Sequence, residues 1–449
     1  MEKILLSKIT NGICKIENDC YITSVVSDSR QVEENSIFLA IIGERVNGED
    51  YAKIALEKGA KLIVSEHDIK DIPKENLCVV ESVLDTNILM AKNYREIFDT
   101  QVIAVTGRVG KTTTKDFIYC AVSPFKNTVK SLGNNNNELG LPKTVYNFTG
   151  KEEMAVLEMG MADFNDVHKL SVATSPICGV ITNIGVSHLQ TMKTQENILK
   201  AKLEICDGIS EDGFLVLNKD DKFLKEAKIE KPKNVFYYAI EDETADVTAS
   251  DIVIDELSTK FILNDGDLKL KVILPTIGNH NVLNALAAYL IATKLGFDKE
   301  KVAKSFGNYT PSGMRQNITT KNDIIYIEDC YNASPDSMKA SLKSLKAIAK
   351  KRSIAVLGDM LELGDDSNKM HCEIGEFANK VGIDFMLCFG EEIKHTAKGF
   401  NKDAKHFNTK QELCDYLISI LKKDDTVLFK ASNGMKFDEI IKIVYENQE

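Results

Sequence analysis

The sequence predicts an α/β protein made of three domains, and two observations lead to this prediction. The chain has 449 residues, and at about 150 residues per domain this length corresponds to roughly three domains. Short apolar runs alternate with amphipathic helical patterns along most of the chain, which is typical of parallel sheets covered by helices. We expect the domains to comprise residues 1–98, 99–313 and 314–449.

The composition argues against several other classes of protein. Hydrophobic residues make up 43% and charged residues 27% of the chain, so it can bury several cores and is not disordered. The formal charge of −11, without a long basic run, argues against nucleic acid as the main partner. No apolar run reaches the ~18 residues of a membrane span, and the first residues lack the apolar core of a signal peptide. The ten cysteines form no CxxC pair, which favours reduced thiols. We expect a cytoplasmic protein and a monomer.

The first domain alternates short strands and helices. Strands are expected at Ser36–Ile41 and Ala60–Val64, with an amphipathic helix at Tyr51–Lys58 between them. A further apolar run, Leu77–Val80, precedes a helix at Leu84–Phe98 that leads into the next domain. The pattern indicates a small α/β module.

A polar turn in this module is a candidate ligand site. It places Ser29 next to Arg30, and a hydroxyl beside a guanidinium fork suits a phosphorylated ligand. A solvated turn explains the same residues. On spacing alone, the solvated turn is the better explanation.

The stretch AVTGRVGKTTTKDF, from Ala104 to Phe117, is the strongest candidate site in the chain. An apolar run at Gln101–Thr106 predicts a buried strand, a glycine-containing turn follows it, and a helix begins near Lys111. Loop N–H groups, the helix dipole and a lysine together form a site for phosphate. The hydroxyl of Thr112 stands where a phosphate-bound Mg²⁺ needs a ligand. The alternative is an ordinary strand-to-helix turn with a surface lysine.

Polar side chains follow the next predicted strands. These strands are expected at Met154–Leu157, Cys178–Thr182 and Phe214–Leu217. Glu158, Asn183 and His188 come after the first two strands, and in open α/β sheets ligands collect at the carboxyl ends of strands. A carboxylate and an imidazole there could reach Mg²⁺ held by a triphosphate. Without the phosphate loop, a locally paired Glu158 and an ordinary loop histidine would be the better explanation.

One lysine is expected on the buried side of a helix. In the predicted helix Gln195–Ile209, Lys202 shares an apolar stripe with Ile198 and Ile205. Burial near a metal site would lower the pKa of this lysine, and a neutral amine can take up CO₂ to form a carbamate. Alternatively, the stem lies on the core while the ammonium group extends into solvent. Periodicity leaves the two explanations equal.

Two further stretches of the central domain carry amide side chains. The loop SLGNNNNELGLP, residues 131–142, contains Asn134, Asn136 and Asn137, whose amides suit a base or an amide-bearing substrate. Asparagine and glycine are also what turns ordinarily contain. The stretch GNHNVLNALAA, residues 278–288, places polar residues at a helix start, with an alanine-rich packing face behind them.

The last third of the chain predicts a Rossmann-like doubly wound domain. Strands are expected at Ile324–Ile327, Ile354–Leu357, Phe385–Cys388 and Val427–Phe429. Helices are expected after them, at Asp336–Ala349, His371–Val381, Lys410–Leu421 and Lys436–Tyr445. Polar clusters at residues 329–332 and 358–360 mark the expected ligand edge, and the turn at residues 311–313 is the expected hinge.

Eight motifs occur along the chain in a fixed order. They are GKTTTKD, GNNNNELGLP, VLEMG, TNIGVSHL, KAKLEI, GNHNVLNALAA, EDCYNASPDSM and VLGDMLELG. In this order they give the chain a resemblance to the Mur ligase family over essentially its whole length. The last two, with the ending KASNGMK, are most similar to the members that attach D-alanyl-D-alanine to UDP-N-acetylmuramoyl-tripeptide.

The resemblance implies a separate binding role for each of the three domains. The N-terminal module would bind the uridine diphosphate of the substrate, and the central domain, a P-loop ATPase-like parallel sheet, would bind ATP. The C-terminal domain would contact the nucleotide and the incoming dipeptide.

The resemblance also implies roles for residues at matching positions. Lys111, Glu158, His188 and Lys202 form the catalytic set, in which Lys202 is carbamylated. Thr112, Glu158 and His188 bind Mg²⁺. The nucleotide-binding set is Thr106, Gly107, Gly110, Lys111, Thr112, Thr113, Asn281, Asn284, Arg315, Asp329, Tyr331 and Asn332. The substrate-binding set is Ser29, Arg30, Asn134, Asn136 and Asn137.

The activity that the resemblance implies is ATP-dependent amide ligation in peptidoglycan precursor synthesis, through an acyl phosphate and a tetrahedral intermediate. Sibling ligases that add the third stem residue, and folylpolyglutamate synthase, remain alternatives. Two positions depart from the usual family pattern: Arg108 replaces a small residue and Asn433 replaces an arginine. They leave open a protein of another class, a weakly active paralogue that binds nucleotide.

Overall fold

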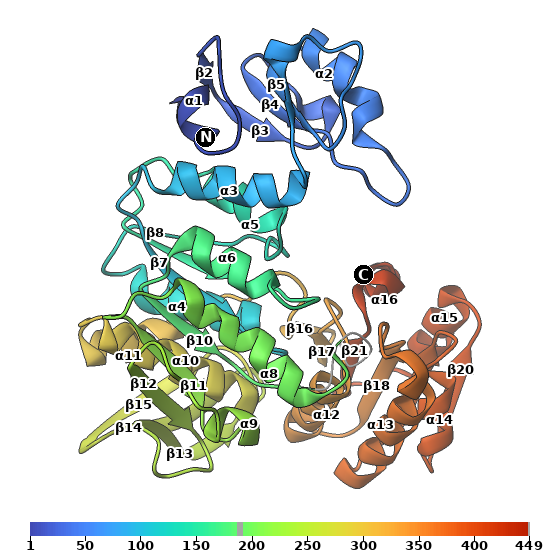
Figure 1. The fold of residues 1–449 in the computed structure, drawn as a ribbon. Helices are drawn as coiled ribbons and strands as arrows, with labels where there is room; N and C mark the ends of the chain where they lie inside the picture. Colours follow the sequence, from blue (N-terminus) through green and yellow to red (C-terminus); the bar gives the residue numbers. More distant parts are fainter. Residues whose placement is uncertain (186–191, 448–449) are drawn as a thin grey trace.

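The computed structural model describes residues 1–185 and 192–447 of the chain. Its strands form a small antiparallel pair and three larger sheets, of four, nine and six strands. The larger sheets follow one another along the sequence, and Figure 1 shows each in its own part of the molecule. We call these parts the N-terminal, central and C-terminal lobes. None of the described helices combines the length and the apolar character needed to span a bilayer.

The N-terminal lobe is built on a small parallel sheet. Its elements are β1 (Ile4–Leu5), α1 (Leu6–Ile9), β2 (Tyr21–Ile22), β3 (Ser24–Val26), β4 (Ser36–Leu39), α2 (Ala52–Glu57), β5 (Ala60–Ser65) and β6 (Leu77–Val79). The sheet has the order β3-β4-β5-β6, and all neighbouring strands are parallel. β4 and β5 are buried along almost their whole length, as is usual in parallel sheets. The predicted elements of this module are confirmed, with small shifts at their ends.

The central lobe contains the largest sheet. Its strands are β7 (Gln101–Thr106), β8 (Thr128–Lys130), β9 (Met154–Glu158), β10 (Cys178–Ile181), β11 (Phe214–Asn218), β12 (Asn234–Ala239), β13 (Val247–Ile254), β14 (Thr259–Asp265) and β15 (Leu268–Leu274). They lie in the order β15-β14-β13-β12-β11-β10-β7-β9-β8. From β8 to β13 all neighbouring strands are parallel. The predicted parallel sheet is confirmed over this part.

The other edge of the central sheet differs from the prediction. The sequence predicts alternating strands and helices along most of the chain, but β13, β14 and β15 follow one another directly and pair antiparallel. The turn between β14 and β15 consists of Gly266 and Asp267, which is too short for a helical crossover. Exposed and less exposed residues alternate along β15, so one face of this edge is open to solvent.

Helices cover both faces of the central sheet. They are α4 (Lys111–Val122), α5 (Gly140–Val145), α6 (Asp166–Thr174), α8 (Gln195–Leu203), α9 (Lys222–Lys225), α10 (Asn279–Lys294) and α11 (Lys299–Ser305). Along β7, Val102 and Ala104 belong to the core on one face, and Ile103 and Val105 to the core on the other. α10 packs against α4, and its alanine residues are buried. The predicted alanine-rich packing face is therefore confirmed.

One helix of the central lobe is shorter than predicted. The prediction extended it to Ile209, but α8 ends at Leu203 and residues 204–208 form a 3₁₀ helix. The neighbouring helix α6 takes part in this change, because the hydroxyl of Ser171 donates to the carbonyl oxygen of Ile205 at 2.6 Å. A bond of this kind replaces the regular helical pattern at the end of the segment.

The C-terminal lobe is a six-stranded sheet with helices on both faces. Its strands are β16 (Asn317–Lys321), β17 (Ile324–Glu328), β18 (Ser353–Gly358), β19 (Phe385–Phe389), β20 (Ala404–Phe407) and β21 (Thr426–Lys430), in the order β16-β17-β21-β18-β19-β20. Its helices are α12 (Pro335–Ile348), α13 (Ser367–Val381), α14 (Lys394–Gly399), α15 (Lys410–Ile420) and α16 (Phe437–Glu446). α12 and α13 contribute to one core, and α15 and α16 contribute to another. The predicted doubly wound domain is confirmed; β16, β20 and α14 were not predicted.

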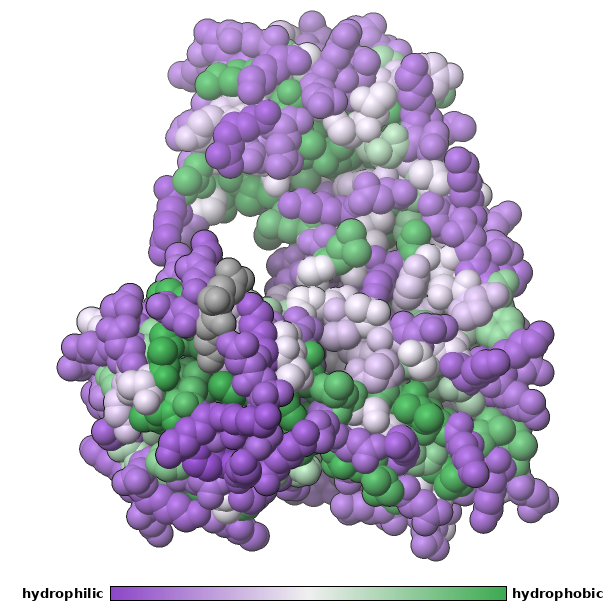
Figure 2. Space-filling view, turned by 180° about the vertical axis from the view of Figure 1, so that it is seen from behind, coloured by the Kyte–Doolittle hydropathy of each residue, from purple (hydrophilic) through white to green (hydrophobic). Residues whose placement is uncertain are grey.

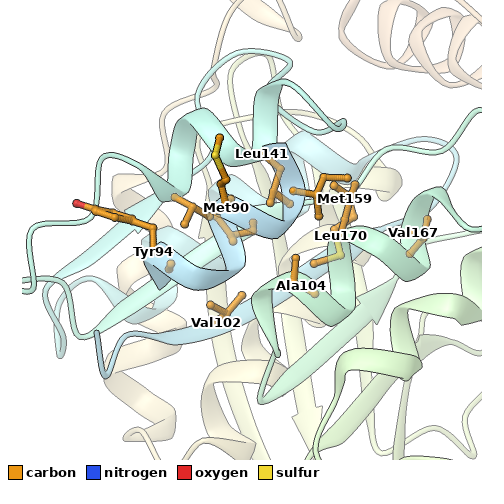
Figure 3. Close-up of a cluster of buried hydrophobic side chains, with 14 of the residues drawn as sticks. Met90, Tyr94, Val102, Ala104, Leu141, Met159, Val167 and Leu170 are labelled. Atoms are coloured by element: carbon orange, nitrogen blue, oxygen red, sulfur yellow. The ribbon is translucent and has the colours of Figure 1, made fainter. Parts of the chain in front are cut away.

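A single helix joins the N-terminal lobe to the central lobe. α3 (Val83–Arg95) packs against α1 and also against α5 and α6. Figure 3 shows Met90 of α3 near Leu141, with Tyr94 of the same helix on one side of them and Leu170 on the other. This hydrophobic cluster also includes Ile37 of the N-terminal sheet. One continuous core therefore crosses from the N-terminal lobe into the central lobe.

The C-terminal lobe is joined to the rest less closely. Seen from behind, an opening separates the N-terminal lobe from the C-terminal lobe, which lies at the lower left (Figure 2). From the central lobe, the buried Ile277 and the partly buried Ile254 join a core of the C-terminal lobe. Among the described residues, the C-terminal lobe thus shares a smaller apolar contact with the central lobe than the N-terminal lobe does.

The joint formed by α3 gives a test of stability. The hydroxyl of Tyr94 donates to the carbonyl oxygen of Phe148 at 2.8 Å and accepts the N–H group of Glu2 at 2.8 Å. We expect Tyr94→Phe to lower the free energy of unfolding by about 1–3 kcal/mol, because it leaves a buried carbonyl without a partner. Urea denaturation measures this change. Tyr21→Phe is the control, since Tyr21 is 56% exposed, and equal effects of the two substitutions would contradict the prediction.

Candidate active site

A cavity of about 690 Å³ lies between the central and C-terminal lobes. The loop between β7 and α4 lines one side, and residues at the carboxyl ends of β17 and β21 line the other. The structure brings most of the predicted site residues together here: Gly107, Gly110, Lys111, Thr112, Thr113, Asn134, Asn136, Asn137, Glu158, Lys202, Asn281, Asn284, Arg315, Asp329, Tyr331 and Asn332. Residues far apart in the sequence therefore share one cavity, at the edge where α/β sheets bind ligands.

The remaining predicted residues have other positions. Thr106 is buried beneath the loop, and its hydroxyl donates to a backbone carbonyl oxygen at 2.9 Å. Ser29 and Arg30 lie in the N-terminal lobe, where the exposed guanidinium of Arg30 pairs with Asp28 at 2.7 Å. Both explanations of that turn remain open. His188 lies outside the described residues.

Two glycines shape the loop between β7 and α4. Gly107 has a φ of +139° and Gly110 a φ of +85°, in the region that favours glycine. A side chain at Gly107 would collide with Thr182, and a Cβ at Gly110 would lie 2.8 Å from Oδ1 of Asn284. Asn183 holds the loop, because its backbone and side-chain oxygens accept the next two N–H groups after Gly107, at 3.1 and 3.0 Å. The first N–H groups of α4 have no partners within the helix, so the loop offers donors to an anion.

Three cationic side chains converge at this loop. The ammonium groups of Lys111 and Lys202 both donate to the carbonyl oxygen of Gly107, at 3.1 and 3.0 Å. Arg108 follows Gly107 directly. Burial lowers the pKa of Lys111, and the charge of Arg108 lowers it further, while the carboxylate of Glu158 raises it. The loop is therefore a region of concentrated positive charge.

Lys202 is buried, which decides between the two explanations that its periodicity leaves equal. It is 3% exposed and lies on α8 near the buried Ile198 and Ala201. Burial lowers the pKa of Lys202 well below its ordinary value, and the charges of Lys111 and Arg108 lower it further. The alternative in which its ammonium group extends into solvent is wrong.

Glu158 lies opposite these cations. Its side chain is buried, and Oε2 accepts the hydroxyl of Thr112 at 2.6 Å. Oε1 accepts a hydrogen bond from the amide of Asn136 at 2.9 Å. Glu158 and Thr112 together present two neighbouring oxygens, the ligand type that Mg²⁺ prefers.

The asparagine loop serves two purposes. The amide of Asn136 contacts Glu158 and also donates to Oδ1 of Asn134 at 2.9 Å. Oδ1 of Asn137 instead accepts the N–H group of Gly140 at 2.9 Å, at the start of α5. The turn explanation therefore holds for Asn137, although all three asparagines also line the cavity.

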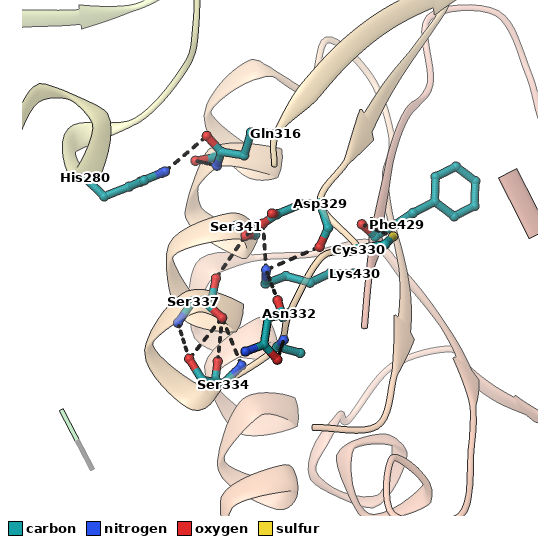
Figure 4. A network of polar contacts seen from close by, with 12 residues as sticks. His280, Gln316, Asp329, Cys330, Asn332, Ser334, Ser337, Ser341, Phe429 and Lys430 are labelled. Carbon is teal, nitrogen blue, oxygen red and sulfur yellow. Dashed lines mark hydrogen bonds and ion pairs between the residues drawn. The ribbon is translucent and has the colours of Figure 1, made fainter. Parts of the chain in front are cut away.

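The C-terminal lobe contributes a polar network to the cavity (Figure 4). The ammonium group of Lys430 donates to the Asp329 carboxylate at 2.7 Å and to the carbonyl oxygen of Asn332 at 3.2 Å. Nearby, the guanidinium of Arg315 lies 3.5 Å from the ring centre of Tyr331, a cation–π contact. These contacts fix the orientation of the predicted residues of this lobe.

Sequence reasoning missed several residues of this cavity. Lys430 ends β21, and its position at the end of a strand was a usable signal. Gln316 joins the lobes, because its Oε1 lies 3.1 Å from Nε2 of His280 (Figure 4) and 2.8 Å from the amide nitrogen of Asn281. Neither His280 nor Gln316 has a sequence pattern that predicts this contact.

Comparison with known proteins identifies the family of this chain. The family description "Mur ligase family, catalytic domain" matches residues 21–98. "Mur ligase middle domain" matches residues 105–292, and "Mur ligase, glutamate ligase domain" matches residues 314–433. With three α/β lobes and a glycine loop facing the cavity, the chain belongs to the Mur ligase family.

Several relatives are similar over nearly their whole length. The UDP-N-acetylmuramoyl-tripeptide–D-alanyl-D-alanine ligase of Bacillus subtilis is 36% identical over 442 residues, covering 95% of this chain and 94% of the relative. The ligase of the same name from Escherichia coli is 28% identical and covers 98% of both chains. Among solved structures, MurF from Acinetobacter baumannii has a TM-score of 0.90 at 27% identity, covering 99% of both chains. MurF ligase from Thermotoga maritima in complex with ADP has a TM-score of 0.87 at 28% identity, covering 95% of this chain and 97% of that one.

The burial of Lys202 gives a pH-dependent prediction. Its pKa in the folded protein is lowered, so below the unfolded value of about 10.4 the unfolded chain binds one more proton. Stability should therefore rise with pH, by about 1.4 kcal/mol per pH unit between the two pKa values. Lys202→Met removes this pH-dependent contribution to the free energy of unfolding. The variant should therefore gain more stability over the natural chain at pH 7 than at pH 9.5.

Urea denaturation in buffer freed of CO₂ measures the difference. Lys200→Met is the control, because Lys200 is exposed on the same helix. If Lys202→Met and Lys200→Met behave alike at both pH values, the lowered pKa of Lys202 is refuted.

Proposed function

We propose that this chain is an ATP-dependent amide ligase that adds D-alanyl-D-alanine to UDP-N-acetylmuramoyl-tripeptide, in the synthesis of peptidoglycan precursors. One observation carries the proposal: Arg108, Lys111 and Lys202 gather at a glycine loop opposite the buried Glu158, in a cavity between two lobes. Such a site binds a highly charged anion together with a cation. The names of the relatives supply the substrates.

ATP fits the positive end of the cavity. Lys111 and the N–H groups at the start of α4 would hold the terminal phosphates. The glycines matter here, since side chains at Gly107 and Gly110 would meet Thr182 and Asn284 and disturb the loop. The proposed nucleotide-binding set is Thr106, Gly107, Gly110, Lys111, Thr112, Thr113, Asn281, Asn284, Arg315, Asp329, Tyr331 and Asn332. Thr106 is included because it lies beneath the loop, and it would not contact the nucleotide directly.

A magnesium ion fits beside the phosphates. The hydroxyl of Thr112 and the carboxylate of Glu158 are hard oxygen ligands that lie 2.6 Å apart. His188 completes the proposed ligand set. When bound, Mg²⁺ neutralises phosphate charge during phosphoryl transfer.

The proposal includes a carbamylated Lys202. Its lone pair forms a bond to the carbon of CO₂, a proton leaves the nitrogen, and an anionic carbamate results. The lowered pKa of Lys202 favours the neutral amine that this step needs. The product carries a negative charge near Lys111 and Arg108, so carbamylation relieves their repulsion.

The reaction then follows from positions and charges. A carboxylate oxygen of the tripeptide attacks the γ-phosphorus of ATP, and the bond to the leaving ADP oxygen breaks, which gives an acyl phosphate. Lys111 and the loop N–H groups neutralise the phosphate oxygens during this step. The amine of D-alanyl-D-alanine attacks the acyl carbon, and the tetrahedral intermediate loses phosphate and a proton to form the amide. Approach of the C-terminal lobe would exclude water that hydrolyses the acyl phosphate.

The other substrate contacts extend along the molecule. Ser29 and Arg30 would bind the uridine diphosphate in the N-terminal lobe, and Asn134, Asn136 and Asn137 would face the muramoyl group. The domain bounds proposed for these roles are 1–98, 99–313 and 314–449. We assign the protein to the cytoplasm, where ATP is available, and expect it to act as a monomer.

The direct test is product analysis. Incubation with ATP, Mg²⁺, D-alanyl-D-alanine and UDP-muramoyl-tripeptide, with either diaminopimelate or lysine as third residue, should yield ADP, phosphate and the pentapeptide product. Mass spectrometry detects the product and identifies the accepted tripeptide. Product formation with single amino acids or glutamate instead would favour a sibling ligase. ATP binding without amide formation would favour a non-catalytic paralogue.

The carbamate proposal has its own test. We expect Lys202→Ala to lower kcat about 100-fold, the upper range for losing a group that supports a metal site. Added short carboxylic acids should restore part of the activity, because they supply the missing anion. Lys200→Ala, on the exposed side of α8, should keep normal activity. Full activity of Lys202→Ala would rule out the carbamate.

A further inference from the structure

The guanidinium of Arg108 forms part of the positive site but has no individual role in the proposed reaction steps. It stands in the loop between β7 and α4 and lines the cavity. Its Nη1 atom is buried and has no hydrogen-bond partner among the described residues. Burial lowers the pKa of Arg108 to about 10, so it remains positively charged at neutral pH. A buried charged donor without a partner is costly unless a ligand supplies one.

The side chain of Arg108 extends from the central lobe toward the C-terminal lobe. The aliphatic part of the Arg108 side chain lies against Gly185. A Cβ atom added at Gly185 would be 2.5 Å from Cγ of Arg108 and 3.2 Å from Oδ2 of Asp336. Asp336 therefore lies close to the arginine, in the first turn of α12. The carboxylates of Asp336 and Glu362 both favour the charged guanidinium, and Glu362 also lines the cavity.

The position of Arg108 in the loop indicates which phosphate it can reach. Its carbonyl oxygen accepts a hydrogen bond from Lys111 at 3.2 Å, and the lysine of such a loop reaches the β- and γ-phosphates. A guanidinium has five N–H donors, so one edge can face a phosphate oxygen while another faces a carboxylate. Arg108 is therefore placed where its guanidinium could face a terminal phosphate as well as the acidic residues of the C-terminal lobe.

We propose that Arg108 contacts the terminal phosphate of ATP and, through Asp336 and Glu362, links nucleotide binding to the approach of the C-terminal lobe. This inference rests on the proposed function as an ATP-dependent ligase. Since ADP lacks the terminal phosphate, Arg108 distinguishes ATP from ADP. It acts as a positioning residue that connects the two lobes across the cavity.

The test compares the binding of two nucleotides. Arg108→Met keeps the stem against Gly185 and removes the guanidinium. Calorimetry should show that the substitution raises the Kd of the β,γ-imido analogue of ATP about 10-fold, the effect of losing one charged hydrogen bond. The Kd of ADP should rise less than about 3-fold. Retained ADP binding shows that the variant is folded. Arg45→Met, at an exposed arginine of the N-terminal lobe, is the control and should leave both values unchanged.

A double-mutant cycle tests the link to the C-terminal lobe. Asp336→Asn should change the Kd of the ATP analogue in the natural chain by about 3-fold or more, but not in the Arg108→Met background. Equal loss of analogue and ADP binding in Arg108→Met, or no loss, overturns the phosphate contact. Equal effects of Asp336→Asn in both backgrounds overturn the link. Failure of the natural chain to bind either nucleotide would instead contradict the proposed function.

Discussion

Two ammonium groups share the carbonyl oxygen of Gly107, and a guanidinium belongs to the next residue. Like charges held this close, with little water to screen them, repel one another. The fold keeps them together because Lys111 begins α4 whereas Lys202 lies on α8, and each helix is anchored in its own core. The lowered pKa of Lys202 and the placement of Glu158 opposite the loop both moderate this repulsion. Lys111 and Arg108 still line the cavity at this loop, which suits the loop to a polyanion.

The joints between the lobes differ in kind. α3 is embedded in a core that runs from the N-terminal sheet to the central sheet, so those two lobes behave as one body. The C-terminal lobe meets the central lobe through a small apolar contact and through the amide of Gln316, which bonds to His280 and Asn281. Polar contacts of this kind are exchanged for others at lower cost than a buried core. Motion between lobes is therefore expected at the C-terminal joint.

The sequence predicted the parts of this structure that depend on local pattern. Buried strands such as β7 follow from the pattern of apolar residues. Periodicity placed Lys202 on the apolar stripe of its helix but did not decide whether its ammonium group is buried. The antiparallel edge was missed, since repeated apolar runs do not reveal the direction of pairing. Lys430 was missed although it ends a strand at the ligand edge. The direction of the Arg108 side chain could not be predicted at all, because it depends on Gly185 and on Asp336 of another lobe.

The continuous core around α3 has a consequence for substrate selection. In the proposed function, the uridine end of the substrate binds the N-terminal lobe and the reacting carboxylate lies at the central loop. The distance between these two points is set when the chain folds, because Tyr94 and its neighbours hold the lobes in one arrangement. A muramoyl peptide that is one residue too short would not bring its carboxylate to the terminal phosphate of ATP. In a longer peptide, the carboxylate would lie beyond this phosphate. The rigid joint would thus select peptides by length, without contacting the residues that differ between them.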